Sequence, residues 1–164
     1  MIKKAIFGAL LASAIAVPPA AAEPDYAASV KVDYDKSLAT LWDYFHRNPE
    51  LSFREYKTGA RMAEELRAVP GMVVTDKVGG TGVVGMLKNG DGPVVLIRAD
   101  MDGLPVQERS GLANSSTVRQ VGVDGLDMPV MHACCHDVHI TSMVGTARQM
   151  GRMKGRWKGT ILFI

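Results

Sequence analysis

Apolar residues recur at three- and four-residue steps in three stretches of the chain, a spacing that places them on one face of a helix. These stretches are residues 37–47, residues 52–69, and a third from Asp137 or His139 to Met150. A proline follows each of the first two, and proline disfavours helical backbone in the residue before it. Ser52 and Glu55 have the spacing of a capping box, which predicts that they cap the second helix.

Short apolar or β-branched runs, separated by glycine-rich turns, predict strands. They cover residues 72–75, 82–87, 93–99 and 160–164. Residues 94–97 are apolar at every position, as expected of a central strand covered on both faces. Asp100 and Asp102 would then emerge at its carboxyl end, the edge where open α/β sheets bind ligands. Residues 110–127 are polar and rich in glycine, which predicts a loop over that site or an ordinary connector.

The first residues have the three parts of a secretory signal. Two lysines precede an apolar run at residues 5–17, and Ala20 and Ala22 place the expected cleavage before Glu23. Since a membrane span needs about twenty apolar residues, residues 1–22 are predicted to be a signal peptide, with an uncleaved anchor as the alternative. The exported chain, residues 23–164, would be periplasmic or secreted and would have no stable membrane association.

The charge balance limits the partners of this exported chain. The full sequence has 19 basic and 17 acidic residues, and removal of Lys3 and Lys4 leaves 17 of each. A formally neutral chain gives no indication of binding to nucleic acid or to an anionic membrane. Residues 159–164 have the character of a buried strand that has just begun, so we expect the domain to be truncated.

Candidate metal ligands are concentrated in residues 131–139, which contain three histidines, two cysteines and one aspartate. Imidazole nitrogen, thiolate sulfur and carboxylate oxygen are the protein donors that bind divalent cations such as zinc. Because no second ligand pair completes a structural tetrahedral site, the pattern indicates an open, catalytic metal site. The alternative is a thiol-containing turn with partly exposed histidines. A disulfide between the adjacent Cys134 and Cys135 would need a strained ring and is not expected.

Four ordered motifs in residues 46–53, 80–85, 98–108 and 131–137 resemble one family of enzymes. This family is the metal-dependent amidohydrolases of the aminoacylase, hippurate-hydrolase and auxin-conjugate-hydrolase type, a branch of the glutamate-carboxypeptidase-like metallopeptidases. The resemblance implies an α/β fold: the amino-terminal part of a zinc-peptidase-like catalytic domain, with a mixed, largely parallel sheet flanked by helices.

The resemblance also implies roles for individual residues. The family binds two divalent ions, usually manganese, zinc or nickel, through a His-Ala-Cys-Gly-His-Asp motif, which makes Cys134 and His136 the expected metal ligands. Asp102 matches the catalytic acid that orients a group of the metal site. Asp100 stands where other branches have a metal-binding histidine, and its role stays open. Glycine occupies the family position of Cys135.

The remaining histidines are expected to support the site. His132 would hydrogen-bond a backbone carbonyl, and His139 would either support a ligand or cap the following helix together with Asp137. His46 belongs to a helix-ending motif and is expected to be structural.

By resemblance, the function is hydrolysis of the amide bond of N-acyl amino acids or similar small amides and peptides, by an enzyme that forms homodimers at full length. The family carries a further Gln-Pro-Ala-Glu-Glu motif, which supplies the general base and a metal ligand and does not occur in these 164 residues. Since loss of a general base costs a factor of about 100 to 10,000, this chain alone is expected to be inactive. The alternative is a non-catalytic metal-binding or interaction remnant of such an enzyme.

Overall fold

A computed structural model describes residues 25–164 of the chain. The predicted signal peptide, residues 1–22, lies outside the described residues. None of the helices in the described part has the length and apolar character needed to cross a membrane.

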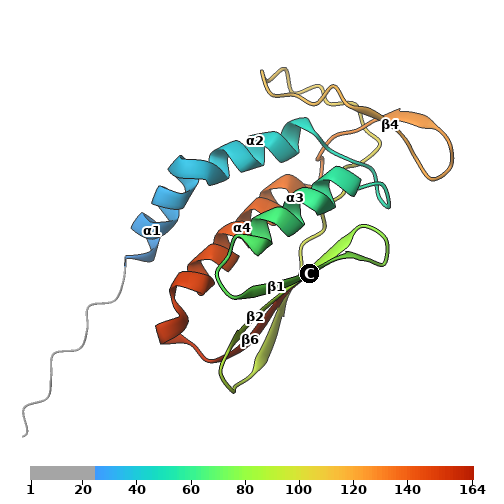
Figure 1. Cartoon of the computed structure of the whole chain (residues 1–164). Helices are drawn as coiled ribbons and strands as arrows, with labels where there is room; N and C mark the ends of the chain where they lie inside the picture. The colour runs from blue at the N-terminus through green and yellow to red at the C-terminus, as the bar shows by residue number, and fades with distance from the viewer. Residues whose placement is uncertain (1–24) are drawn as a thin grey trace, which may run out of the picture.

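A four-stranded mixed sheet forms the base of the domain (Figure 1). Its strands, in spatial order, are β1 (Met72–Val78), β2 (Gly82–Asn89), β6 (Gly159–Phe163) and β3 (Val94–Ile97). The sheet is mixed, as predicted, although parallel pairing is confined to β3 and β6. The other two pairings are antiparallel because β1 and β2 form a hairpin and β6 runs against β2.

The helices lie on one side of this sheet (Figure 1). The first helical region consists of α1 (Tyr26–Asp33), a π-helical segment η1 (Tyr34–Leu38) and α2 (Ala39–Arg47), which follow one another without a break. It starts earlier than the predicted helix but ends, as expected, before Asn48-Pro49. The other helices are α3 (Tyr56–Arg67), α4 (His136–Arg152) and a 3-10 turn η2 (Lys154–Arg156).

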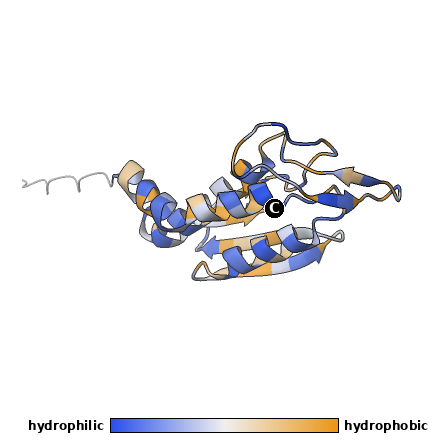
Figure 2. Ribbon diagram, turned by 90° about the horizontal axis from the view of Figure 1, so that it is seen from above, coloured by the Kyte–Doolittle hydropathy of each residue, from blue (hydrophilic) through white to orange (hydrophobic). Residues whose placement is uncertain are grey.

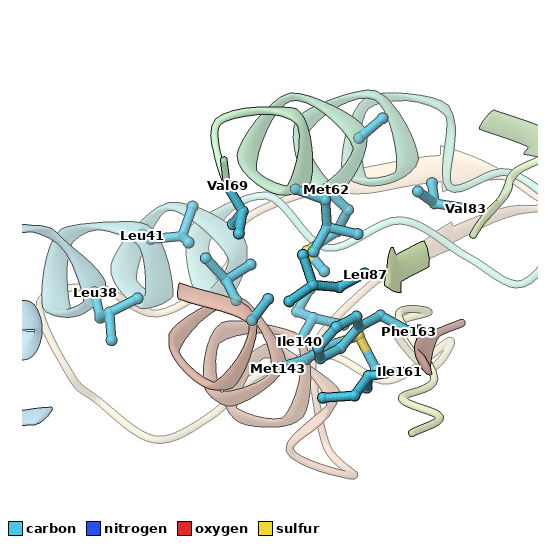
Figure 3. Close-up of a cluster of buried hydrophobic side chains, with 14 of the residues drawn as sticks. Leu38, Leu41, Met62, Val69, Val83, Leu87, Ile140, Met143, Ile161 and Phe163 are labelled. Atoms are coloured by element: carbon cyan, nitrogen blue, oxygen red, sulfur yellow. The ribbon is translucent and has the colours of Figure 1, made fainter. Parts of the chain in front are cut away.

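The hydrophobic core fills the space between these helices and the sheet (Figure 3). Helix α3 packs on β1 and β2, and α2 and α3 both contact α4. The helices carry polar as well as apolar residues along their length (Figure 2), as expected of helices with one face on the core. Most of the largest side chains that are fully buried come from α2, α3, α4 and the strands, among them Phe45, Leu66, Ile140, Leu87 and Phe163.

Strand β3 exists as predicted, but its position in the sheet differs from the prediction. It is an edge strand within the described residues, with β6 as its only strand neighbour. Val94 and Leu96 are 67% and 55% exposed, whereas a covered central strand would bury both. The apolar run indicates a preference for burial, but it does not determine which parts of the chain lie beside and over the strand.

The segment predicted as a loop contains regular structure. Strands β4 (Arg119–Val121) and β5 (Asp127–Pro129) pair antiparallel as a separate two-stranded sheet. The Gln120 side chain accepts a hydrogen bond from the Leu51 amide at 2.6 Å and donates one to the Arg54 carbonyl at 3.2 Å. The hairpin is therefore fastened to the turn between α2 and α3.

The expected capping box at the start of α3 is absent. Ser52 donates a hydrogen bond to Asp102 instead, and Glu55 accepts one from Thr81 Oγ1 at 2.7 Å. The cap is supplied by Glu50, whose buried carboxylate accepts hydrogen bonds from the Lys57 amide at 3.1 Å and the Thr58 amide at 2.7 Å. A carboxylate at a helix amino terminus satisfies free amides and interacts favourably with the helix dipole.

Glu50→Ala is therefore expected to lower the free energy of unfolding by about 2 kcal/mol, because it removes a cap and leaves buried donors unpaired. Urea denaturation followed by circular dichroism measures this change. Glu64→Ala, at an exposed position of the same helix, is the matched control and should change stability little. Equal losses in the two variants would contradict the capping role of Glu50.

Candidate metal centre

The carboxyl end of β3 and the amino terminus of α4 meet at one edge of the sheet. His136 is the first residue of α4, and its Nδ1 lies 2.9 Å from the Asp102 carbonyl oxygen and 3.0 Å from Asp102 Oδ1. The Ser52 hydroxyl donates to the other oxygen of this carboxylate. An imidazole held through Nδ1 by a carboxylate presents Nε2 as a metal donor, the usual arrangement of a ligating histidine.

The two cysteines beside His136 are exposed and are not joined by a disulfide. Two of the predicted site residues, Asp102 and His136, are in direct contact. Cys134 lies in the turn that leads into α4. Within residues 25–164, no three His, Cys, Asp or Glu side chains are grouped closely enough to hold a metal ion together. The donor types fit a divalent metal, but the described residues supply only part of a ligand set.

A cavity of about 500 Å³ opens beside Asp102. Its lining includes Ser52, Thr81 and Asp100 as well as apolar side chains from α3, β2 and α4. Asp100 forms an ion pair with Arg98. The cavity places polar groups and apolar surface next to the Asp102–His136 pair, as a site for a small molecule requires.

Asp137 is fully enclosed and connects the metal motif to α2. Its Oδ2 accepts hydrogen bonds from Trp42 Nε1 at 2.9 Å and from His46 Nδ1 at 2.9 Å. Of the two roles left open for His139, capping of α4 together with Asp137 is not what the structure shows, because the Asp137 carboxylate bonds to Trp42 and His46 and the residue before the helix, Cys135, makes no capping bond. His139 instead lies on the exposed side, with its ring centroid 5.8 Å from that of His136.

His46 makes contacts with two acidic residues that the sequence did not indicate. Its Nε2 lies 3.4 Å from Glu108 Oε1 without the geometry of a hydrogen bond. Burial raises the pKa of Glu108, but hydrogen bonds from Ser110 and Ser116 and the nearby His46 hold the pKa below its usual value. The buried carboxylates Glu108 and Asp137 therefore lie on two sides of one imidazole.

His132 is buried, at 5% exposure, and neither of its ring nitrogens has a hydrogen-bond partner within the described residues. The expected bond to a backbone carbonyl is absent. Burial holds the pKa of His132 below its usual value, because the charged ring would lose its hydration in the interior, and the nearby Asp137 acts in the opposite direction.

This lowered pKa predicts a dependence of stability on pH. Below a pH of about 6.5 the unfolded chain takes up a proton that the folded chain does not, so the free energy of unfolding falls as the pH drops from about 6.5 towards the folded pKa. One such group contributes at most about 1.4 kcal/mol per pH unit. Urea unfolding of the wild type and of His132→Gln at several pH values measures the difference. Equal pH slopes would contradict the prediction, and His139→Gln is the exposed control.

Cys135 has left-handed backbone, with φ at 61°. Glycine adopts this conformation without cost, whereas a side chain costs about 1 kcal/mol. Residue 135 thus has the backbone conformation that favours glycine, although its side chain is a thiol.

Sequence reasoning did not find the buried partners Trp42, Glu50 and Glu108. Trp42 lies within residues 37–47, where the apolar spacing predicts only a core-facing helix side, and such spacing gives no sign that the indole N–H has a distant acceptor. The acidic residues Glu50 and Glu108 lie inside the motifs but have no spacing that distinguishes a buried carboxylate from an exposed one.

Comparison with known proteins places these features in a family context. The chain is 39% identical over 120 residues to the N-acetylcysteine deacetylase of Bacillus subtilis, a match that covers 73% of this chain and 29% of that protein. It is 34% identical over 119 residues to the IAA-amino acid hydrolase ILR1-like 2 of Arabidopsis thaliana, which covers 73% of this chain and 25% of that protein. No protein-family model matches the chain.

Among solved structures, the chain is similar to the Bacillus subtilis YXEP protein, described as a dinuclear metal binding peptidase from the M20 family. The TM-score is 0.70 at 35% identity, over 81% of this chain and 35% of that chain. The mixed sheet with its helices thus corresponds to about a third of that M20 peptidase chain.

The chain is a homologue of the amidohydrolases and metal peptidases of the M20 family, which confirms the resemblance and the fold class. It spans about a quarter to a third of the length of these relatives.

Proposed function

We propose that the chain provides part of the metal site of an amidohydrolase that cleaves N-acyl amino acids or similar small amides. The observation that carries the proposal is the contact between His136 Nδ1 and the Asp102 carboxylate at the carboxyl edge of the sheet. Cys134 and His136 are the proposed ligands for divalent metal, two ions in the complete site, with manganese, zinc or nickel as candidates.

A divalent metal held by Cys134 and His136 would supply activation of a water molecule and polarisation of the scissile carbonyl. Asp102 is proposed as the catalytic-site acid that fixes the orientation of the His136 ring, with Ser52 holding the carboxylate in turn. The cavity beside Asp102 would receive the small substrate, and its apolar lining suits the acyl part.

Metal binding by the chain tests this proposal directly. Isothermal titration of the wild type with Zn²⁺ and Mn²⁺ should detect binding that Cys134→Ser and His136→Ala each weaken. Asp102→Ala should weaken it about 10- to 100-fold, the usual effect of losing a group that orients a ligand. Asp91→Ala, at an exposed position in the turn before β3, is the control. Unchanged affinity in all three site variants would refute the proposed ligands.

Catalysis by this chain alone is not expected, because the general-base motif of the family does not occur in its sequence. A panel of N-acyl amino acids should show no turnover above background, and clear turnover would contradict this expectation. The incomplete ligand set favours the second candidate function, a non-catalytic metal-binding or interaction remnant. Metal binding without turnover is compatible with both candidate functions. A fusion of this chain to the remaining catalytic segment of a relative would separate them: restored hydrolysis supports the amidohydrolase, and absent hydrolysis supports the non-catalytic remnant.

Export and assembly belong to the same proposal. The lysines, apolar run and small residues before Glu23 support cleavage after residue 22 and a periplasmic or secreted location. Amino-terminal sequencing of the expressed protein tests the cleavage. Homodimer formation is proposed only for the full-length enzyme, by analogy with the family.

A further inference from the structure

Cys135 places a second thiol directly beside a proposed metal ligand. Both Cys134 and Cys135 are exposed and unpaired, and they sit in the turn that leads into α4. The left-handed backbone of Cys135 favours glycine, the residue that the family has there. A residue held in a strained conformation is often functional, which points to a role for the Cys135 thiol.

The spacing of two adjacent cysteines suits a bridging ion better than a disulfide. Neighbouring Cα atoms are about 3.8 Å apart, whereas disulfides usually join Cα atoms about 4.4–6.8 Å apart. A metal ion bound to both sulfurs at about 2.3 Å each, in tetrahedral geometry, allows the sulfurs to remain about 3.7 Å apart. An ion therefore relieves the constraint that makes the direct bond between neighbours strained.

We infer that Cys134 and Cys135 together form a two-thiolate site for one soft divalent cation, of which Cd²⁺ is the probe. Thiolate ligands select soft ions over manganese, so Cys135 would shift the metal preference of a motif that has a single thiol in the family. On binding, each thiol releases its proton to solvent and each sulfur donates an electron pair to the cation, with no change of oxidation state. The inference rests on the proposed function only in that Cys134 is a ligand in both.

The position of the two cysteines in the turn leaves both sulfurs open to an ion. The exposed positions of both cysteines give the cation access without unfolding of the turn.

Cadmium titration of the whole chain tests the inference, with thiolate-to-cadmium charge-transfer absorbance as the readout. The wild type should bind one Cd²⁺ per chain at least about tenfold more tightly than Cys135→Ser and Cys135→Gly. Mn²⁺ affinity should be the same in all three proteins. Cys135→Gly restores the residue that the backbone favours and should be no less stable than the wild type, while Cys135→Ser keeps a side chain of similar size.

The outcomes separate this inference from the proposed metal site. Equal Cd²⁺ affinity in the wild type and both Cys135 variants, with a loss in Cys134→Ser, would overturn the inference and leave the proposed site intact. If the wild type binds none of Cd²⁺, Zn²⁺ and Mn²⁺, both the inference and the proposed metal site are refuted.

A trivalent arsenical gives a second, independent measurement. Phenylarsine oxide forms two As–S bonds with a pair of neighbouring thiols and releases its oxygen as water, so mass spectrometry should find one stable adduct on the wild type. Cys134→Ser and Cys135→Ser should each lose the adduct in the presence of a competing monothiol. An adduct that survives in either variant would contradict a joint site.

Discussion

Phe45→Ala is expected to lower the free energy of unfolding by about 3–5 kcal/mol, because it removes a large side chain from a packed core and leaves a cavity. Phe45 is fully buried on α2 and belongs to the cluster that joins α2, α3 and α4 to the sheet. Domains of this size are stable by about 5–15 kcal/mol, so the loss would unfold a substantial fraction of the protein on mild heating.

The matched control for this prediction is Phe53→Ala, the same substitution at a side chain that is 73% exposed. The control should change stability little, and urea denaturation of both variants at one pH measures the contrast. Similar losses at the two positions would show that the core does not lie between α2 and the sheet as described.

Asp137→Ala is expected to cost about 2–4 kcal/mol, because it leaves two buried donors, Trp42 Nε1 and His46 Nδ1, without their acceptor. The same change frees α4 from α2 at the residue after His136, so metal affinity should fall together with stability. Tryptophan fluorescence during urea unfolding reports the first effect, and titration with Zn²⁺ reports the second.

Two further variants identify the source of that loss. Asp137→Asn retains an oxygen acceptor and should recover part of the stability, and Trp42→Phe removes a single donor and should cost less than Asp137→Ala. Asp43→Ala removes an exposed acid from the same helix as Trp42 and should have a much smaller effect. A loss in Asp137→Ala no greater than that in Asp43→Ala would refute the buried network.

The sequence predicted the elements well because their signals are local. Apolar spacing located α2, α3 and α4, and β-branched runs between glycines located β1, β2, β3 and β6, to within a few residues for most ends. Asp102 was predicted to emerge at the carboxyl edge of the sheet, but its contact with His136 was not predicted.

Partner choice was much harder to predict, because it depends on contacts between distant parts of the chain. Ser52 has the local pattern of a cap, yet its hydroxyl bonds to Asp102, 50 residues away, and Glu50 supplies the cap. Asp137 has the local pattern of a capping residue as well, and its carboxylate bonds to a histidine 91 residues earlier. In each case a tertiary hydrogen bond outweighs the local one, and no spacing in the sequence records it.

The position of β6 has a consequence for the order of events during synthesis. Strand β6 lies between β2 and β3, although it is made last of the three. The ribosome must therefore produce residues 98–158 before β3 gains its partner, which takes several seconds at about 5–20 residues per second. During that interval Val94 to Ile97 have no strand to pair with, so the apolar segment stays without its backbone partners until β6 is made.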